Sequence, residues 1–309
     1  MKYFTKDWYV LMQHLHYTTG MTQVPDGEYT DERIAALCKD RMKAYADEQR
    51  ELYDAPPERL DINFDELTPE DFAEYDVARG KLKVPATMEE VKAGLERDYA
   101  ARLKRFEERP PFDARQAIRD FADMYRAKLE NAYAGLPDWV KTACDARLIA
   151  MDCLPESVYR DLKAEEERNR RLFEAINGAA EDAMKDTPEE IRRQLSFHDG
   201  EILEFTRRGG DICMLIREDF IPCEGQTPYT RVTFKDAHVT ERDEVLTFEP
   251  LTYEADGQEI TGHCTWLYEE IYKTTEGCEV HMLLAENDLC YLTIRCSGIE
   301  CECDIDYRE

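Results

Sequence analysis

The hydrophobic period of the chain changes once, near residue 197, and this change constrains the fold more than any other feature. Before it, apolar residues recur every three to four positions, which is the spacing of helices that bury one stripe. After it, apolar residues alternate with polar ones between tight turns, as in strands that bury one face. The sequence therefore predicts an α+β protein with a helical domain at 1–195 and a β domain at 196–309. At 309 residues, each domain can bury its own core.

Long helices are predicted over residues 29–54, 86–108, 112–133 and 154–184. Thr87, followed by Glu90, forms a capping box at the start of the second. Prolines separate the first three, because a proline and the residue before it resist a continuing helix.

The helix at 154–184 has an interrupted apolar stripe, with Glu165 and Asn169 among its positions. The helix either breaks there or leaves the core as a solvated bridge, and we favour the bridge over a binding groove. A short helix then follows, for which Thr187 is the expected N-cap residue and Glu190 the expected partner in a capping box.

Strands are predicted from residue 199 onward. EILEFTR and ICMLIRE flank Gly209-Gly210-Asp211, which is a hairpin signal. The further strand segments are YTRVTFKDAHV, TWLYEEIYKT, CEVHMLLA, LCYLTIRCS and GIECECDIDY. Because the connections are short and contain no helix, the strands should pair mostly antiparallel, in a sandwich or an open barrel.

Negative charge is concentrated in the β domain. Residues 196–309 contain 9 Lys/Arg and 26 Asp/Glu, a formal charge of −17 out of −28 for the whole chain. Nucleic-acid binding needs a basic surface that displaces counterions from phosphates, so the composition excludes nucleic acid and anionic membranes as partners. Such a surface attracts a basic protein or a cation, or it simply keeps the protein soluble.

The sequence points to the cytosol. The first twenty residues lack the uninterrupted apolar region of a secretory signal, and no apolar run is long enough to cross a membrane. The eleven cysteines are irregularly spaced, which favours reduced thiols. Three serines, no G-x-S-x-G motif and no phosphate-binding loop argue against common hydrolases and nucleotide enzymes, and no cofactor is predicted.

His198 and Asp199 stand at the change of period and allow two interpretations. An Asp beside a His can fix the tautomer of the ring and raise its basicity, as in a general-base pair. Adjacent residues of an extended chain point in opposite directions, however, so a turn must redirect one of them. The sequence HDG favours such a turn, with Asp199 bonding to a later backbone amide and His198 seated in the joint between the domains. We favour this structural joint.

A metal site and a recognition surface are the other candidates. The possible metal ligands are His263, Cys264, Cys301 and Cys303, but their spacing does not suit a zinc site. Buried cysteines acting as small hydrophobic residues are the favoured interpretation, which extends to Cys278, Cys290 and Cys296.

In WLYEEIY, a regular strand places Trp266, Tyr268 and Glu270 on one face and Glu269 on the other. Trp266 and Tyr268 then form either an exposed recognition surface or, as we favour, part of the core or its rim. In CEVHMLLA, alternation places His281 on the polar face, at the solvent or in a shallow groove.

The last strand carries an acidic ladder, formed by Glu300, Glu302, Asp304 and Asp306. Carboxylates two residues apart on a strand lack the loop curvature of a calcium site. We interpret the ladder as a solvated face that discourages edge-to-edge pairing with other sheets.

Several stretches in both halves are similar to one family. They are MKYFTKDWY, VKTACDARLIAMDCLPESVYRDLK, FHDGEILEF, VTFKDAHV, WLYEEIY, EVHMLL and LTIRC. Through them the chain resembles an uncharacterised bacterial family, domain of unknown function 4085, least clearly over residues 20–110. The resemblance implies a bacterial cytosolic protein but no reaction, ligand or catalytic residue. The chain departs from the family between Arg217 and Arg231, where EDFIPCEGQTPYT replaces a Gly-rich aromatic hairpin and puts any role of that loop in doubt.

The sequence thus predicts a non-enzymatic protein that makes protein–protein contacts through its acidic β domain. A sharper version is an immunity or antitoxin-like protein that neutralises a basic toxin. The alternative is an enzyme with an acid–base site between the domains, built from His198, Asp199 and either Glu270 or His281. Oligomeric state and ligand are left open.

Overall fold

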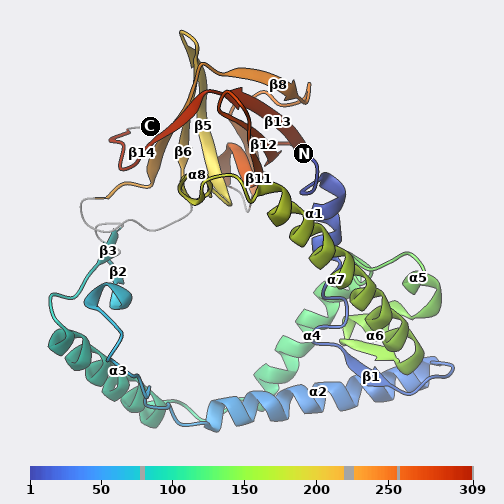
Figure 1. The fold of residues 1–309 in the computed structure, drawn as a ribbon. Coiled ribbons are helices and arrows are strands. Elements are labelled where there is room, and N and C mark those ends of the chain that lie inside the picture. The colour runs from blue at the N-terminus through green and yellow to red at the C-terminus, as the bar shows by residue number, and fades with distance from the viewer. Residues whose placement is uncertain (77–80, 219–225, 256–257, 308–309) are drawn as a thin grey trace. The chain divides into compact units, whose positions relative to one another are not determined.

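The computed structural model describes residues 1–76, 81–218, 226–255 and 258–307, and it confirms the α+β class (Figure 1). Most of the segment that departs from the family pattern, residues 219–225, lies outside the described part. The helices are α1 Lys6–Gln13, α2 Asp31–Asp54, α3 Met88–Glu108, α4 Ala114–Glu130, α5 Val140–Ala143, α6 Ala146–Ala150, α7 Glu156–Met184 and α8 Glu189–Gln194, with a 3₁₀ turn η1 at Pro69–Phe72.

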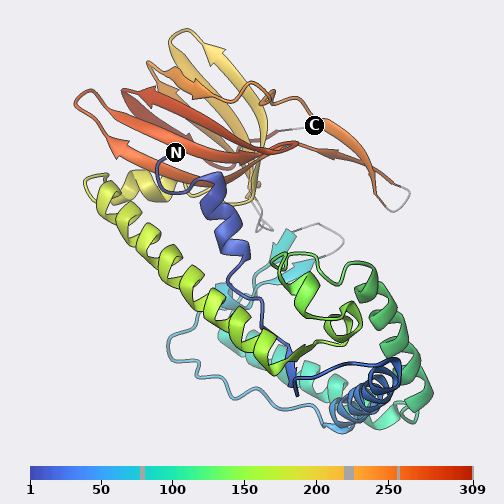
Figure 2. The ribbon, with the colours of Figure 1, turned by 90° about the vertical axis from the view of Figure 1, so that its right-hand side faces the viewer.

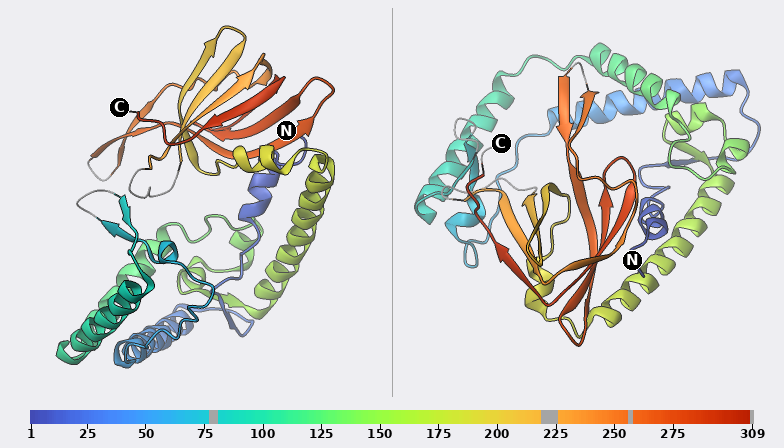
Figure 3. Two further views of the ribbon diagram at one scale, coloured as in Figure 1. Left: turned by 60° about the vertical axis from the view of Figure 1, so that its left-hand side comes forward. Right: turned by 90° about the horizontal axis from the view of Figure 1, so that it is seen from above.

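One eight-stranded sheet dominates the C-terminal part of the chain. Its strands are β5 Gly200–Arg208, β6 Asp211–Arg217, β7 Tyr229–Lys235, β8 His238–Arg242, β11 Cys264–Lys273, β12 Cys278–Ala285, β13 Leu289–Cys296 and β14 Gly298–Glu302. They lie in the order β14-β7-β6-β5-β11-β12-β13-β8, and neighbouring strands pair antiparallel as predicted. The sheet is strongly twisted, as the two views of Figure 3 show, and in the described residues it does not close into a barrel.

Three small strand pairs were not predicted. β1 Thr22–Val24 pairs parallel with β4 Cys153–Pro155, so the helical half is not purely helical. β2 Glu74–Asp76 pairs with β3 Lys81–Lys83, and β9 Leu251–Ala255 with β10 Gln258–Gly262 in a hairpin that projects from the large sheet (Figure 2). Segments of three to five residues are too short for a period to be read from the sequence.

The predicted helix starts are only partly correct. At α3, the Thr87 hydroxyl accepts from the Glu90 amide at 3.2 Å, while the Glu90 carboxylate reaches the amide of Ala86 at 2.8 Å, which confirms the capping box within one residue. At α8, the N-cap residue is Pro188 and no side chain caps the helix. Thr187 is buried instead, and its hydroxyl donates to the Ile271 carbonyl oxygen of β11 at 2.6 Å. This hydrogen bond to β11 takes the place of the predicted cap at the start of α8.

Helix α7 is continuous through the predicted interruption, and its polar residues have partners. The Glu165 carboxylate accepts from the Trp139 indole N–H at 3.0 Å, and the Asn169 amide donates to the His14 carbonyl oxygen at 3.2 Å. Glu166 is buried and accepts from the Thr18 hydroxyl at 2.8 Å. Glu166 and Asn169 therefore hold the chain after α1 against α7, and Glu165 binds the residue before α5, roles that a stripe of apolar positions cannot reveal.

The contacts group the chain into two compact units. A helical unit comprises Gln13–Phe72 and Pro85–Arg171, and a β unit comprises Met1–Met12, Ala73–Val84 and Leu172–Glu309. Met1–Met12 and the end of α7 pack with the strands, so the units differ in extent from the predicted domains 1–195 and 196–309.

Candidate functional site

The predicted turn brings His198 and Asp199 into contact at the start of β5. The Gly200 amide donates to the Phe197 carbonyl oxygen, and the Asp199 amide donates to that of Trp266, both at 2.8 Å. Asp199 has a φ of 64°, a left-handed conformation that redirects its side chain. Its Oδ2 lies 2.9 Å from the Nδ1 of His198. The expected bond from a later backbone amide to Asp199 is wrong, because the carboxylate contacts the ring instead.

The contacts of this pair lie within the β unit. The His198 ring stands edge-on to Tyr268 with centroids 4.8 Å apart, and Phe197 packs on Trp266 in the core. Both side chains of the pair remain about half exposed, at 51% and 52%. The pair can therefore exchange protons with solvent, but it does not line any of the cavities described below.

A β-bulge at Leu267 changes the face on which the following residues lie. Trp266 pairs with Leu284 and Tyr268 with Leu283, so Leu267 is an extra residue in β11. Trp266 is completely buried in the sheet core, and its indole N–H donates to Glu269 at 2.9 Å. The prediction that Trp266 shares a face with Tyr268 is therefore wrong, and so is the exposed recognition surface that included Trp266.

Glu270 anchors the N-terminal segment on the opposite face. Its carboxylate is fully buried and accepts the amides of Tyr3 and Phe4 at 2.6 Å, the amide of Lys2 at 2.9 Å and the Tyr272 hydroxyl at 2.6 Å. Burial opposes ionisation, but the hydrogen bonds outweigh it and lower the pKa of Glu270. This corrects the assignment of Glu270 as an acid–base candidate: its carboxylate is an anchor enclosed by donors.

The N-terminal segment makes further contacts with the same face. Trp8 packs edge-on against Tyr268 and stacks on Phe173 of α7, with centroids 4.7 and 5.4 Å apart. The Lys6 amide donates to the Tyr291 hydroxyl at 2.7 Å. Tyr268 thus packs under α1, in agreement with the favoured core or rim interpretation.

Glu269, on the core side, has the opposite electrostatic behaviour. Burial raises its pKa from 4.5 to about 7, although the hydrogen bond from Trp266 acts against this shift. A carboxyl whose pKa is higher in the folded state stabilises below its unfolded pKa, and this stability is lost as the pH rises through the folded value. The lost part is about 2 kcal/mol, less than the full shift because the side chain is partly exposed.

We therefore expect the free energy of unfolding to fall between about pH 4.5 and pH 7 and the Glu269→Gln variant to lack this decline. Denaturant unfolding across this range measures it. The exposed Glu276→Gln variant serves as the control and should keep the decline. An unchanged pH profile in Glu269→Gln would contradict the assignment.

His281 lies on the polar face of β12, as predicted from the alternation with buried Val280 and Met282. Its Nε2 is 2.8 Å from Glu279, its Nδ1 is 3.4 Å from the Thr293 hydroxyl, and its ring stands edge-on to Tyr272. Burial alone would raise the pKa of Glu279, but its bonds to Arg295 and His281 lower it. Both ring nitrogens are thus engaged, Nε2 within β12 and Nδ1 with Thr293 of β13.

The candidate metal ligands do not gather into one site. Across residues 1–76, 81–218, 226–255 and 258–307, no cluster of three or more His, Cys, Asp or Glu side chains is suited to a metal ion. Cys264 is buried, and burial raises the pKa of its thiol. His263 has a buried Nδ1 without a hydrogen-bond partner. The Cys301 thiol donates to the Gln194 carbonyl oxygen at 3.4 Å, whereas Cys303 is exposed.

The acidic ladder is shorter than predicted. Glu300 pairs with Lys235 at 2.8 Å and Glu302 with Arg231 at 3.1 Å, and both carboxylates are about 70% exposed on the edge strand β14. The strand ends there, because Asp304 has a φ of 57° and turns to accept the Thr227 amide. The position at an edge agrees with protection against edge pairing.

An acidic surface that sequence reasoning missed lies after β8. We define the acidic loop surface as Glu241, Glu244, Glu249, Glu286 and Asp288, which lie in the segment 241–249, together with Val245, and in the β12–β13 turn. The Glu286 carboxylate accepts the amides of Thr247 at 3.0 Å and Phe248 at 2.7 Å, and the Asp243 amide donates to the Tyr291 carbonyl oxygen at 3.0 Å. These bonds join the loop after β8 to the β12–β13 turn, which brings the carboxylates together.

Little positive charge offsets this surface. Lys6 is engaged with Asp243 at 2.9 Å, and the Arg242 guanidinium donates to the Leu246 carbonyl oxygen while lying over Phe248. Within the described ranges, Glu244, Glu249, Glu286 and Asp288 have no basic partner. Val245, which follows Glu244 in the same loop, is 60% exposed. An exposed apolar side chain beside carboxylates adds apolar area when such a surface binds a protein.

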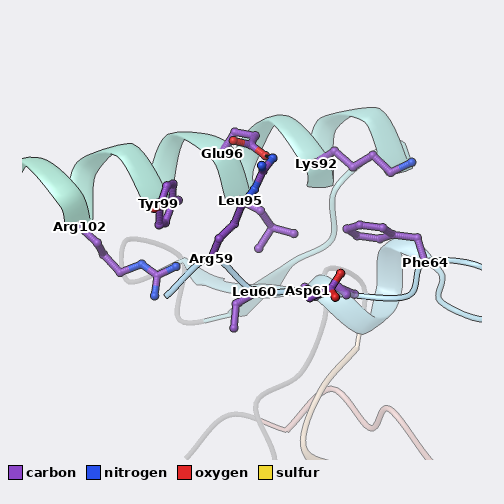
Figure 4. A pocket seen from close by; sticks show the side chains of 10 residues that line it. Arg59, Leu60, Asp61, Phe64, Lys92, Leu95, Glu96, Tyr99 and Arg102 are labelled. Carbon is purple, nitrogen blue, oxygen red and sulfur yellow. Dashed lines mark hydrogen bonds and ion pairs between the residues drawn. The ribbon is translucent and has the colours of Figure 1, made fainter. Parts of the chain in front are cut away.

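Three cavities lie elsewhere. One, of about 430 Å³, is enclosed by the segment 59–64 and α3 (Figure 4); Arg59 pairs with Glu96 there, and the Lys92 ammonium lies over Phe64. A second, of about 490 Å³, lies between α8 and the β7–β14 edge and includes Cys301 and Cys303. A third, of about 560 Å³, lies between Tyr29 and α5. The charges in the first cavity are mixed and already paired in part, which gives it no evident chemistry.

Comparison with models of protein families, with curated proteins and with solved structures gave no match. Among the described residues, no helix has both the length and the apolar character needed to cross a membrane.

Proposed function

We propose that this protein is a non-enzymatic, cytosolic bacterial protein whose β unit binds a basic protein partner. The observation that carries the proposal is the acidic loop surface with the exposed Val245 in the same loop. Like-charged carboxylates held together by backbone hydrogen bonds repel one another, and a cationic partner relieves this repulsion. Val245 supplies apolar area that becomes buried in the complex.

An immunity or antitoxin-like role is the sharper form of this proposal. A neutralising protein must capture its target quickly, and complementary charge accelerates association. The formal charge of −17 over residues 196–309 supports such a role. The partner would carry clustered Lys and Arg around an apolar pocket that receives Val245.

The Glu244→Lys/Glu249→Lys variant tests the surface. Neither carboxylate has a hydrogen-bond partner among the described residues, so the fold should persist. A partner co-purified from the native host at low salt should bind the variant at least about tenfold more weakly, which corresponds to about 1.4 kcal/mol. The difference should shrink at high salt, where charges are screened. Isothermal titration at both salt concentrations measures it.

The control is Glu48→Lys/Glu51→Lys on α2, which changes the net charge equally at two exposed positions of the helical unit. It should bind almost like the unaltered protein. If both variants bound the partner equally weakly, the effect would come from net charge alone. If Glu244→Lys/Glu249→Lys bound the partner as tightly as the unaltered protein, the acidic loop surface would not be the binding site.

An enzyme that uses His198 and Asp199 as an acid–base pair is the second candidate. The 2.9 Å contact between the ring and the carboxylate favours it, because that contact can orient the imidazole for proton transfer. We rank it below the binding role because a substrate needs a cavity beside the pair, and the three cavities described above are lined by other residues.

A further inference from the structure

Two cysteines face each other inside the sheet without a bond between them. Cys278 opens β12, Cys296 closes β13, and the two residues are direct partners in the antiparallel register. Their sulfur atoms are 3.4 Å apart, and the residues are 4% and 3% exposed. Other buried cysteines of the β unit, such as Cys264 and Cys290, make no sulfur–sulfur contact of this kind in the described chain.

The backbone already has the separation that a disulfide needs. Directly opposed residues of an antiparallel pair have Cα atoms about 4.5 or 5.5 Å apart, depending on the hydrogen-bonding position. Disulfides span Cα distances of about 4.4–6.8 Å, so either position is compatible. Closing the bond requires the sulfur atoms to approach from 3.4 Å to about 2.0 Å, which side-chain rotation can supply.

The pair lies at the end of the β12–β13 ladder. Cys278 and Cys296 are the last pair of the β12–β13 ladder, and the end of a ladder opens more easily than its middle. The chain then turns away, since the Ser297 amide and hydroxyl both donate to the Lys235 carbonyl oxygen of β7. A bond at this point would fix β12 to the strand end from which the chain crosses to β14.

The two thiols also differ in reactivity. The hydrogen bond between the two thiols lowers the pKa of Cys278, while the same bond and burial raise that of Cys296. Cys278 is therefore the better nucleophile, because the thiolate is the attacking species.

We propose that Cys278 and Cys296 form a reversible disulfide by exchange with a low-molecular-weight disulfide such as oxidised glutathione. The Cys278 thiolate attacks one sulfur of the reagent, forms a mixed disulfide and releases one thiolate. Cys296 loses its proton to solvent, attacks the Cys278 sulfur and releases the second thiolate. The two cysteines lose two electrons and two protons in total, and the reagent gains them to become two thiols.

The experiment uses the full chain, folded, in buffers with increasing ratios of oxidised to reduced glutathione. Free thiols are then blocked by alkylation during acid unfolding, and linked peptides are identified by fragmentation mass spectrometry. Trypsin separates the two cysteines because Arg295 lies between them. We expect a Cys278–Cys296 linkage that increases with the oxidised fraction, carries no retained glutathione and disappears when reduced glutathione is restored.

Single variants separate this exchange from general oxidation. Neither Cys296→Ala nor Cys278→Ala can form the linkage, so in each variant the remaining thiol should carry at most a mixed disulfide with glutathione. Cys290→Ala removes an equally buried thiol of β13 and should keep the linkage. The proposal fails if the linkage forms only after denaturant is added, or if Cys303 is modified throughout while Cys278 and Cys296 stay reduced.

Discussion

Replacing Glu270 with alanine should destabilise the β unit by about 4 kcal/mol and release the N-terminal segment. The substitution leaves the partly buried amides of Lys2, Tyr3 and Phe4 and the Tyr272 hydroxyl without their acceptor. Each unsatisfied donor costs about 1–3 kcal/mol unless water enters. Partial relaxation of the segment limits the total, because freed amides regain hydrogen bonds with solvent.

Two measurements check this prediction. Equilibrium unfolding gives the loss of stability, and hydrogen exchange should show lost protection at residues 2–4 before global unfolding. Glu269→Gln is the matched control, because it alters the neighbouring carboxyl on the core side and should leave those amides protected. Protection that persists in Glu270→Ala would mean that Lys6 and Trp8 hold the segment without the carboxylate.

The same anchor predicts an acid response of the N-terminal segment. Because its hydrogen bonds lower the pKa of Glu270 in the folded state, their stabilising effect is present above the ordinary value of 4.5 and is lost as the pH falls through the folded value. Glu269 has the opposite dependence, since its contribution is lost as the pH rises toward 7. Adjacent residues of one strand thus respond to pH in opposite directions because they lie on opposite faces.

The hydrophobic period predicted the helices and strands, because these depend on the local sequence. The helices α2, α3, α4 and α7 and the strands β12 and β13 lie within predicted segments, and β5, β6 and β11 match theirs to within one residue at each end, because each buries a repeating stripe or face. The turn at His198-Asp199-Gly200 also followed from residue type, since Asp tolerates the left-handed backbone and Gly eases the turn.

The strict alternation of strand faces gave a wrong prediction in β11, where a bulge adds one residue. The bulge at Leu267 reverses the faces of all later residues of β11, and a strict period of two cannot contain an extra residue. The face of Trp266 was therefore predicted incorrectly.

Contacts between segments that are far apart in the chain could not be predicted from the sequence. The anchoring of Lys2–Phe4 by Glu270 and the joining of the loop after β8 to the β12–β13 turn depend on which strands become neighbours. The residues of the acidic loop surface are ordinary loop carboxylates in the sequence. They form a surface only because the Asp243 and Thr247 amides bond to residues some forty positions later.

Gly277→Ala should be the most damaging small substitution in the sheet, at about 4 kcal/mol from strain and overlap together. Gly277 has a φ of 150°, which side chains rarely tolerate, and an added Cβ would lie 2.1 Å from the Cys296 carbonyl oxygen and 2.6 Å from the Cα of Ser297. Both obstacles are backbone atoms, so no side chain can rotate away. In the variant, the turn before β12 and the chain that follows β13 must therefore move apart.

Substitutions at two other glycines separate the contribution of backbone strain from that of steric overlap. Gly209 has a φ of 66° with nothing within 4 Å, so Gly209→Ala should show strain alone, about 1 kcal/mol. Gly298 has open space and no left-handed backbone, so Gly298→Ala should cost little. Chemical denaturation of the three variants should rank them Gly277, Gly209, Gly298 from largest to smallest loss. If Gly277→Ala were no worse than Gly209→Ala, the turn before β12 would have to lie farther from Cys296 than it does here. The approach of β12 and β13 that places the two thiols in contact would then be lost as well.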